Sequence, residues 1–165
     1  MKSHFRGWAY FVAFYALLFT CILLLCIIGD VFYNTIMPAY FYFIISFFVI
    51  FVWIWVIFGE LRQKVISVEV GYDHVVIKRY MSLGSPKTFY FNEIDGFKTS
   101  DLPSRGAVYE YLYIMAGGKK IAKMSQFYHK NYTDIKEMLI SEKVKNLGYE
   151  EYSANRELKE IFASL

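Results

Sequence analysis

The sequence predicts a membrane-anchored α+β protein, in which a two-helix transmembrane hairpin precedes an antiparallel β-domain that is closed by a helix. Two long uncharged runs, 8–28 and 38–59, occupy the first third of the 165-residue chain. After residue 64 the pattern changes to short strands separated by turn residues. A hydrophobic fraction of 56% and an aromatic fraction of 21% are too high for an ordinary soluble domain of this length.

The first uncharged run, 8–28, has the length of a membrane span. As a helix it would be about 31 Å long, close to the thickness of the hydrocarbon core of a bilayer. It is longer than the apolar region of a signal peptide, and no small-residue cleavage pattern follows it, so we expect it to be retained. A second span is expected at 39–59. Neither span contains Asp, Glu, Lys, Arg or His, which argues against an ion or proton pathway.

The charges that flank the two spans predict their orientation. Lys2 and Arg6 precede the first span and Arg62 and Lys64 follow the second, whereas the connection 29–39 carries one acidic residue and no basic one. By the positive-inside rule, both termini and the β-domain lie on the cytoplasmic side. Arg62 and Lys64 are the candidate contacts to the anionic membrane surface.

One face of the first span consists of small side chains at spacings of four, three and four residues: Ala9, Ala13, Ala16 and Thr20. The second span is bulky and aromatic-rich, so this helix-packing face would let the two helices approach closely. We expect the face to pack within the hairpin. A dimerisation surface is the alternative.

The β-domain begins with alternating strand patterns, which we expect at 65–70, 74–81, 88–91, 96–100, 109–115 and 120–124. Loops are expected at 82–87 and 101–107. Gly117 and Gly118 suit a two-residue hairpin turn, and the sheet strands are expected to end with the strand after it.

A helix pattern follows the last strand pattern. It is expected to begin at Asn131 or Thr133, to run to about Leu147, and to end at Gly148. The tail, 149–165, could add a short amphipathic helix that begins near Ser153.

Three segments carry a family resemblance: VEVGYDHVVIKR, FYFNEIDGF, and LYIMAGGKKIAKMSQFYHKNYTDIKEML. With the preceding hairpin, their order resembles the bacterial pleckstrin-homology-like (PH-like) membrane proteins, over about 64–148. The resemblance implies a transmembrane hairpin at 1–62, a PH-like antiparallel β-sandwich or barrel with a C-terminal capping helix at 63–148, and a tail at 149–165. It also implies a binding or scaffolding role at the bacterial inner membrane.

The distribution of charge restricts the ligands of such a domain. Phosphoinositide-binding PH domains carry a cluster of cations around the first hairpin turn, but here the turn 71–74 is short and contains Asp73. Lys78 and Arg79 are adjacent in a strand and point to opposite faces. These features argue against specific phosphoinositide recognition. After residue 59, sixteen Lys or Arg stand against fourteen Asp or Glu, which argues against nucleic acid as a partner.

A candidate partner surface consists of a tyrosine series and the basic group beside the Gly117–Gly118 turn: Tyr109, Tyr111, Tyr113, Lys119, Lys120 and Lys123. Alternation places the tyrosines on one face and the intervening apolar residues in the core. The tyrosines could be covered by the tail, lie on the bilayer surface, or bind a partner. The lysines could be a solvated strand edge or contact an acidic protein.

The sequence predicts no catalytic residue, no metal site and no cofactor. The three histidines lie in separate segments, and no phosphate-binding loop or nucleophile motif occurs. Asp73 with His74, or Glu93 with Asp95, are the nearest approach to an acid–base pair.

We therefore expect a non-catalytic, membrane-tethered interaction or scaffolding module, whose partners are the lipid bilayer and another protein. The alternative is a small regulatory or immunity-type membrane protein, in which the hairpin itself binds another membrane protein.

Overall fold

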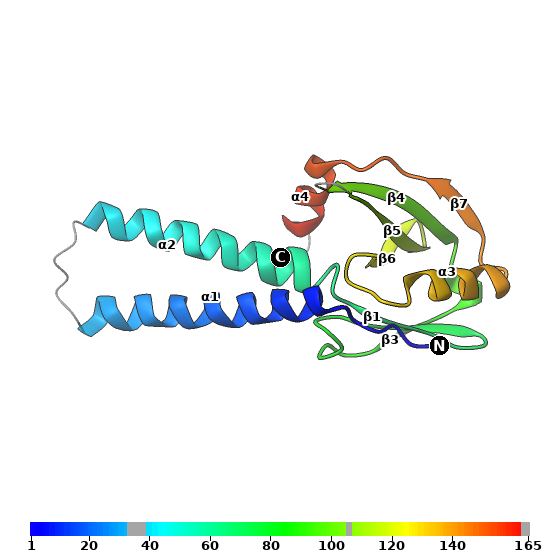
Figure 1. Cartoon of the computed structure of the whole chain (residues 1–165), viewed down its shortest axis with the longest axis horizontal. Helices are drawn as coiled ribbons and strands as arrows, with labels where there is room; N and C mark the ends of the chain where they lie inside the picture. Colours follow the sequence, from blue (N-terminus) through cyan, green and yellow to red (C-terminus); the bar gives the residue numbers. More distant parts are fainter. Residues whose placement is uncertain (33–38, 105–106, 163–165) are drawn as a thin grey trace.

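The computed structural model describes residues 1–32, 39–104 and 107–162, and it shows a mixed α+β fold (Figure 1). Two long apolar helices, α1 (Gly7–Phe32) and α2 (Ala39–Ile54), lie side by side and extend away from the β-domain. α2 continues as a π-helix, η1 (Trp55–Leu61). By length and composition, Gly7–Leu25 and Phe43–Leu61 are each apolar enough to cross a membrane. The predicted turn between them, at 33–38, lies outside the described residues.

The small face of α1 lies against α2. Ala9 and Ala16 are buried. Trp53 Nε1 of α2 donates a hydrogen bond of 2.9 Å to Thr20 Oγ1, which itself donates to the Ala16 carbonyl at 2.7 Å. Ala13 packs against the same buried cluster. Within one chain, this face contacts α2 through Trp53 and shares a buried cluster with η1 and with Val65 and Tyr128 of the adjoining domain. Its role as a helix-packing face stays a prediction.

The β-domain contains two sheets. The first is antiparallel, in the order β1–β2–β3, with bounds Ser67–Val70, His74–Lys78 and Lys87–Tyr90. The second has the order β6–β5–β4–β7, with bounds Lys119–Ser125, Ala107–Ala116, Gly96–Ser104 and Asn146–Tyr149. A short 3-10 turn, η2 (Phe91–Glu93), connects the sheets. Within the described residues the two sheets remain separate, so the fold is not a closed barrel, which corrects that alternative of the prediction.

The main core lies between the two sheets and α3 (Tyr132–Ser141). The first sheet contributes small branched side chains such as Val68 and Val75, and the second contributes Phe97 and Leu112. α3 buries Tyr132, Ile135 and Leu139 against them, because these positions share one face of a helix. The predicted hairpin turn at Gly117–Gly118 forms, and both residues have the positive φ that such a turn requires.

The chain after α3 differs from the prediction. α3 ends at Ser141 rather than near Leu147, because Lys143 adopts a left-handed conformation, and Gly148 lies within β7 instead of ending a helix. β7 pairs in parallel with β4, so the strands do not end with β6. Val144 and Leu147 fit a helical pattern. In the structure, however, Val144 packs against the main core, and Leu147 packs against the cluster that contains Tyr111.

The prediction of a loop at 101–107 is also wrong for residues 101–104 and 107, which the structure describes as strand. β4 and β5 remain paired out to Ser104 and Ala107, so residues 101–104 belong to the strand. Pro103 is tolerated there because β7 covers β4 only near Phe97–Thr99, which leaves the other side of β4 unpaired at Pro103.

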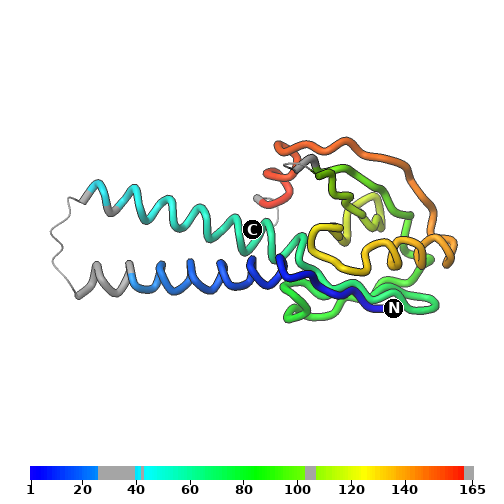
Figure 2. Tube along the Cα trace, viewed as in Figure 1, coloured from blue at the N-terminus to red at the C-terminus, as the bar shows by residue number. Residues whose placement is uncertain are grey.

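The segment before α1 and the tail as far as Phe162 both lie against the β-domain (Figure 2). The segment before α1 lies antiparallel beside β1, where Ser3 N donates to the Val68 carbonyl at 2.8 Å. Arg6 N donates to the Tyr128 carbonyl at the same distance. The Asn131 side chain, at the start of α3, also holds this segment through Lys2 and His4. At the other end, the tail forms α4 (Ala154–Phe162), which lies beside the domain-proximal end of α2 (Figure 1).

Candidate functional site

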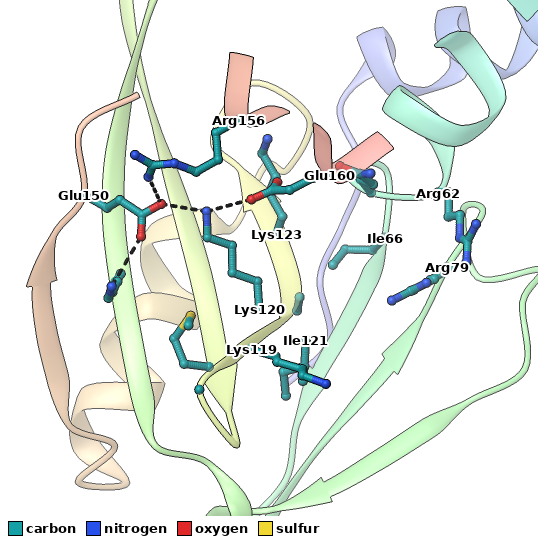
Figure 3. A pocket seen from close by; sticks show the side chains of 15 residues that line it. Arg62, Ile66, Arg79, Lys119, Lys120, Ile121, Lys123, Glu150, Arg156 and Glu160 are labelled. Carbon is teal, nitrogen blue, oxygen red and sulfur yellow. Dashed lines mark hydrogen bonds and ion pairs between the residues drawn. The ribbon is translucent and has the colours of Figure 1, made fainter. Parts of the chain in front are cut away.

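An open-sided cavity of about 790 Å³ lies beside β6, between the two sheets and below the end of η1 (Figure 3). Its lining contains seven Lys or Arg and two Glu. The charged residues are Arg62, Arg79, Lys98, Lys119, Lys120, Lys123, Arg156, Glu150 and Glu160. They come from six separate parts of the chain, which only the fold brings together. We call this the basic cavity.

The cations at one end of the basic cavity are paired. Glu150, just after β7, accepts from Lys120 at 2.7 Å and from Lys98 at 3.3 Å, and Arg156 of α4 also donates to it. Burial would raise the pKa of Glu150, but these three cations lower it to about 2. Lys120 also contacts Glu160 at 3.0 Å. We call this part the glutamate end.

The other end holds Arg62, Arg79 and Lys119, and we call it the arginine end. Arg79 follows β2 and extends into the cavity, beside Arg62 at the end of η1 (Figure 3). Burial lowers the pKa of Arg79, and the positive charge of Arg62 lowers it further. Among the described residues, neither Arg79 nor Lys119 has a carboxylate within ion-pair distance.

Behind the basic cavity lies a buried network of two lysines and two glutamates. Lys64 Nζ contacts Glu60 Oε1 of η1 at 2.6 Å and Glu157 Oε1 of α4 at 2.7 Å. Lys123 Nζ of β6 contacts the same Glu157 oxygen at 3.1 Å. The hydroxyl of Tyr152 donates to Glu157 Oε2 at 2.6 Å. We call this the buried ion network, and it joins η1, β6 and the tail.

The protonation states in the buried ion network follow from its geometry. Burial alone would raise the pKa of Glu157, but Lys64 and Lys123 lower it to about 2. Burial alone would lower the pKa of Lys64, but Glu60, Glu157 and the surrounding groups raise it well above its ordinary value. For Lys123, burial prevails and lowers the pKa.

The six residues of the candidate partner surface occupy different environments. Tyr111 and Tyr113 are buried, and Tyr152 of the tail packs against their cluster. The ammonium group of Lys123 lies 4.6 Å from the centroid of the Tyr111 ring. That of Lys120 lies 4.1 Å from the centroid of the Tyr113 ring. Lys123 is itself buried. The other two lie nearer the surface: Tyr109 is partly exposed, and Lys119 is exposed at the hairpin turn. A partner surface that includes all six residues stays a prediction.

The two candidate membrane contacts also occupy different environments. Arg62 lines the basic cavity, with its guanidinium carbon 5.7 Å from the centroid of the Phe58 ring. Lys64 points inward and is 7% exposed, because it joins the buried ion network.

The acidic residues considered for acid–base chemistry lie in turns. Asp73 contacts His74 Nδ1 at 2.5 Å in the β1–β2 turn, and both side chains are substantially exposed. Glu93 accepts from the backbone of Tyr90, and Asp95 accepts from the backbone of Gly118, so each stabilises a turn. Within the described ranges, no group of three or more His, Cys, Asp or Glu could hold a metal ion.

Sequence reasoning did not identify the residues that complete the site, which are Lys98, Glu150, Arg156, Glu157 and Glu160. No local signal marks them, because each is an ordinary polar residue in its own segment. The chain matches no protein-family model, no curated protein and no solved structure. Function therefore has to be inferred from the geometry of this chain.

Proposed function

We propose that this chain is a non-catalytic interaction module, anchored by a transmembrane hairpin at the cytoplasmic face of the bacterial inner membrane, with a PH-like β-domain as its binding part. The short, hydrogen-bonded junction between hairpin and domain is the observation that supports this most. Only residues 62–66 separate η1 from β1, and the segment before α1 pairs with β1. Both ends of the hairpin are thus fixed to the domain, which suits a module held at one height above a membrane.

The outer surface of the hairpin supports membrane insertion. Its exposed side chains are large and apolar, for example Leu25, Phe43 and Phe47, which are 68, 77 and 74% exposed. Such a continuous apolar surface needs lipid or another protein to cover it. The basic residues at the domain end of the hairpin favour a cytoplasmic domain.

The β-domain supports the PH-like and non-catalytic parts of the proposal. Two small sheets share one core with an amphipathic helix, as the resemblance implies. Glu93 and Asp95, one of the two candidate acid–base pairs, are occupied in turn hydrogen bonds. Turnover of a substrate by purified protein that requires Asp73, His74, Glu93 and Asp95 would contradict the non-catalytic assignment.

Site-specific photo-crosslinking in native membranes tests which part binds a protein partner. A photoreactive residue replaces either Leu83, 90% exposed on the domain, or Phe47, 74% exposed on α2, in the full chain. A protein adduct from the position of Leu83, and none from that of Phe47, would support the domain as the binding part. The reverse pattern would support the alternative, a regulatory or immunity-type protein whose hairpin binds another membrane protein.

Orientation is tested with a single surface cysteine. Tyr72, in the β1–β2 turn, is 93% exposed, so Tyr72→Cys is accessible in a chain whose Cys21 and Cys26 are replaced by Ala. We expect an impermeant maleimide to label it only after the cytoplasmic face is opened. Labelling from outside the inner membrane would reverse the proposed orientation.

A further inference from the structure

Four aromatic side chains form a continuous row that leads from α1 onto the β-domain. The ring of Trp8, in the first turn of α1, lies 5.4 Å from that of Phe11 and 5.7 Å from that of Phe127, measured between ring centroids. The ring of Phe127 lies 5.0 Å from that of Tyr109, near the start of β5. We call Phe11, Trp8, Phe127 and Tyr109 the aromatic row. It connects a candidate membrane span with the sheet through direct ring contacts.

Backbone hydrogen bonds on both sides of Phe127 hold the middle of the aromatic row. On one side, Gln126 N donates to the Glu110 carbonyl at 2.9 Å, which ties the segment to β5. On the other side, Arg6 N donates to the Tyr128 carbonyl at 2.8 Å, which ties it to the start of α1. Phe127 itself packs against the buried cluster at the base of the hairpin. The position of the row therefore follows from backbone contacts as well as from ring packing.

Trp8 places the aromatic row at the edge of a bilayer. It is the second residue of the candidate span Gly7–Leu25. When the hairpin spans a bilayer, the ends of its apolar stretches lie at the level of the headgroups. Only one ring, that of Phe127, separates Trp8 from Tyr109. Tyr109 is therefore within reach of the same layer.

The exposed rings suit the headgroup layer. Trp8 and Phe11 are 57 and 55% exposed, and Tyr109 is partly exposed. Tryptophan and tyrosine combine a large apolar body with one polar group, and both are enriched where membrane proteins cross the bilayer interface. A protein partner could also cover such rings. Lipid is favoured because the row continues the exposed apolar surface of α1 without interruption.

We propose that the aromatic row is a second membrane contact, through which Trp8 and Tyr109 seat the β-domain on the headgroup layer of the bilayer. The proposal rests on the membrane anchoring proposed above. The hairpin then fixes the height of the domain, and the aromatic row fixes its tilt. Among the roles considered for the tyrosine series, this assigns Tyr109 to the bilayer surface. The β1–β2 turn, with Tyr72 at its tip, lies at the end of the first sheet away from the hairpin and should remain in water (Figure 1).

Quenching of tryptophan fluorescence by brominated lipids tests the proposal on the full chain. The three native tryptophans are replaced by Phe, which keeps a ring at each position, and a single tryptophan is then introduced. Tyr109→Trp reports on the aromatic row. Tyr72→Trp reports on the distant turn and Phe47→Trp on the anchor, at positions that are 93 and 74% exposed. The vesicles consist of phosphatidylethanolamine and phosphatidylglycerol with brominated acyl chains, and iodide is the aqueous quencher.

We expect the brominated lipids to quench Tyr109→Trp at least about threefold more than Tyr72→Trp, because an interfacial apolar side chain enters the boundary between headgroups and acyl chains by about 5–10 Å. Iodide should quench the two variants in the reverse order. Equal lipid quenching would overturn the proposal. Protection of Tyr109→Trp from both quenchers would also overturn it, because protein would then cover the ring, whether this chain or a partner.

The anchor reporter separates failure of the second contact from failure of the anchoring. Lipid quenching of Phe47→Trp without quenching of Tyr109→Trp would leave the anchoring in place and refute the second contact alone. Quenching of neither variant would refute both.

A second reporter within the aromatic row guards against misfolding of Tyr109→Trp, which thermal unfolding would reveal. Phe127→Trp keeps a ring in the middle of the row and should also be quenched by lipid more than Tyr72→Trp. Quenching of Phe127→Trp no stronger than that of Tyr72→Trp would contradict the membrane contact, whatever the fate of the first variant.

Discussion

Glu157 is the residue on which docking of the C-terminal helix depends most, and Glu157→Gln tests this. The carboxylate is 5% exposed and accepts from Lys64, Lys123 and Tyr152 at 2.7, 3.1 and 2.6 Å. Glutamine keeps the size but removes the charge, so Lys64 is left with Glu60, and Lys123 loses the carboxylate that it contacts. Removing one partner of a buried ion pair costs about 3–5 kcal/mol. Because the amide oxygen still accepts one hydrogen bond, we expect the lower end, about 3 kcal/mol.

This cost should appear as undocking of α4 before global unfolding. About 3 kcal/mol is a change on the order of 100-fold in the docking equilibrium. α4 has nine residues, too few for a stable helix without tertiary contacts, so an undocked α4 loses its helical hydrogen bonds. Hydrogen-exchange mass spectrometry of the full chain in lipid nanodiscs should therefore show α4 amides exchanging on the order of 100-fold faster, with little change in β5.

Glu160→Gln is the matched control on the same helix. Glu160 pairs with Lys120 at 3.0 Å, but its side chain is 32% exposed, and exposed ion pairs contribute at most about 1 kcal/mol. The control should accelerate exchange of α4 by no more than about fivefold. Equal exchange in the two variants would refute the argument that the buried ion network holds α4 in place.

Two further predictions concern the β-domain. Gly96→Ala should destabilise the domain by about 2–4 kcal/mol in thermal or denaturant unfolding, because Gly96 has a φ of +149° and an added Cβ would lie 2.2 Å from the Lys145 carbonyl oxygen. Gly117→Ala, with a φ of +57° and no atom within 4 Å of the added Cβ, should cost only about 1 kcal/mol. Acid should also destabilise the fold. The pKa values of Glu150 and Glu157 are lowered from an ordinary 4.5 to about 2 in the folded protein. Their contribution to the free energy of unfolding is therefore complete above pH 4.5 and is lost as the pH falls from there toward 2. A flat thermal-unfolding profile between those two pH values would contradict this.

The parts of the fold that the sequence predicts are those with a local cause. Two apolar runs predict two helices because their length and lack of charge need no partner to be recognised. The β5–β6 hairpin is predictable because Gly117 and Gly118 supply the positive φ of its turn. Alternation correctly separates Leu112, which enters the main core, from Tyr111 and Tyr113 on the opposite face.

The parts that the sequence does not predict depend on contacts between distant segments. Val144 and Leu147 continue the apolar spacing of α3, and nothing local indicates that Leu147 instead belongs to a strand beside β4. Lys64 follows an apolar span and therefore resembles a lysine that reaches the membrane surface. Only the fold brings Glu157 to it and turns its side chain inward. The basic cavity has the same origin, since its cations are dispersed along the chain.

The buried ion network and the basic cavity share Lys123, which contacts Glu157 and lines the basic cavity. Loss of the Glu157 charge therefore makes the basic cavity more positive, although it weakens the docking of α4. The same substitution leaves Lys123 without its carboxylate partner, so the wall of the basic cavity and the position of α4 change together.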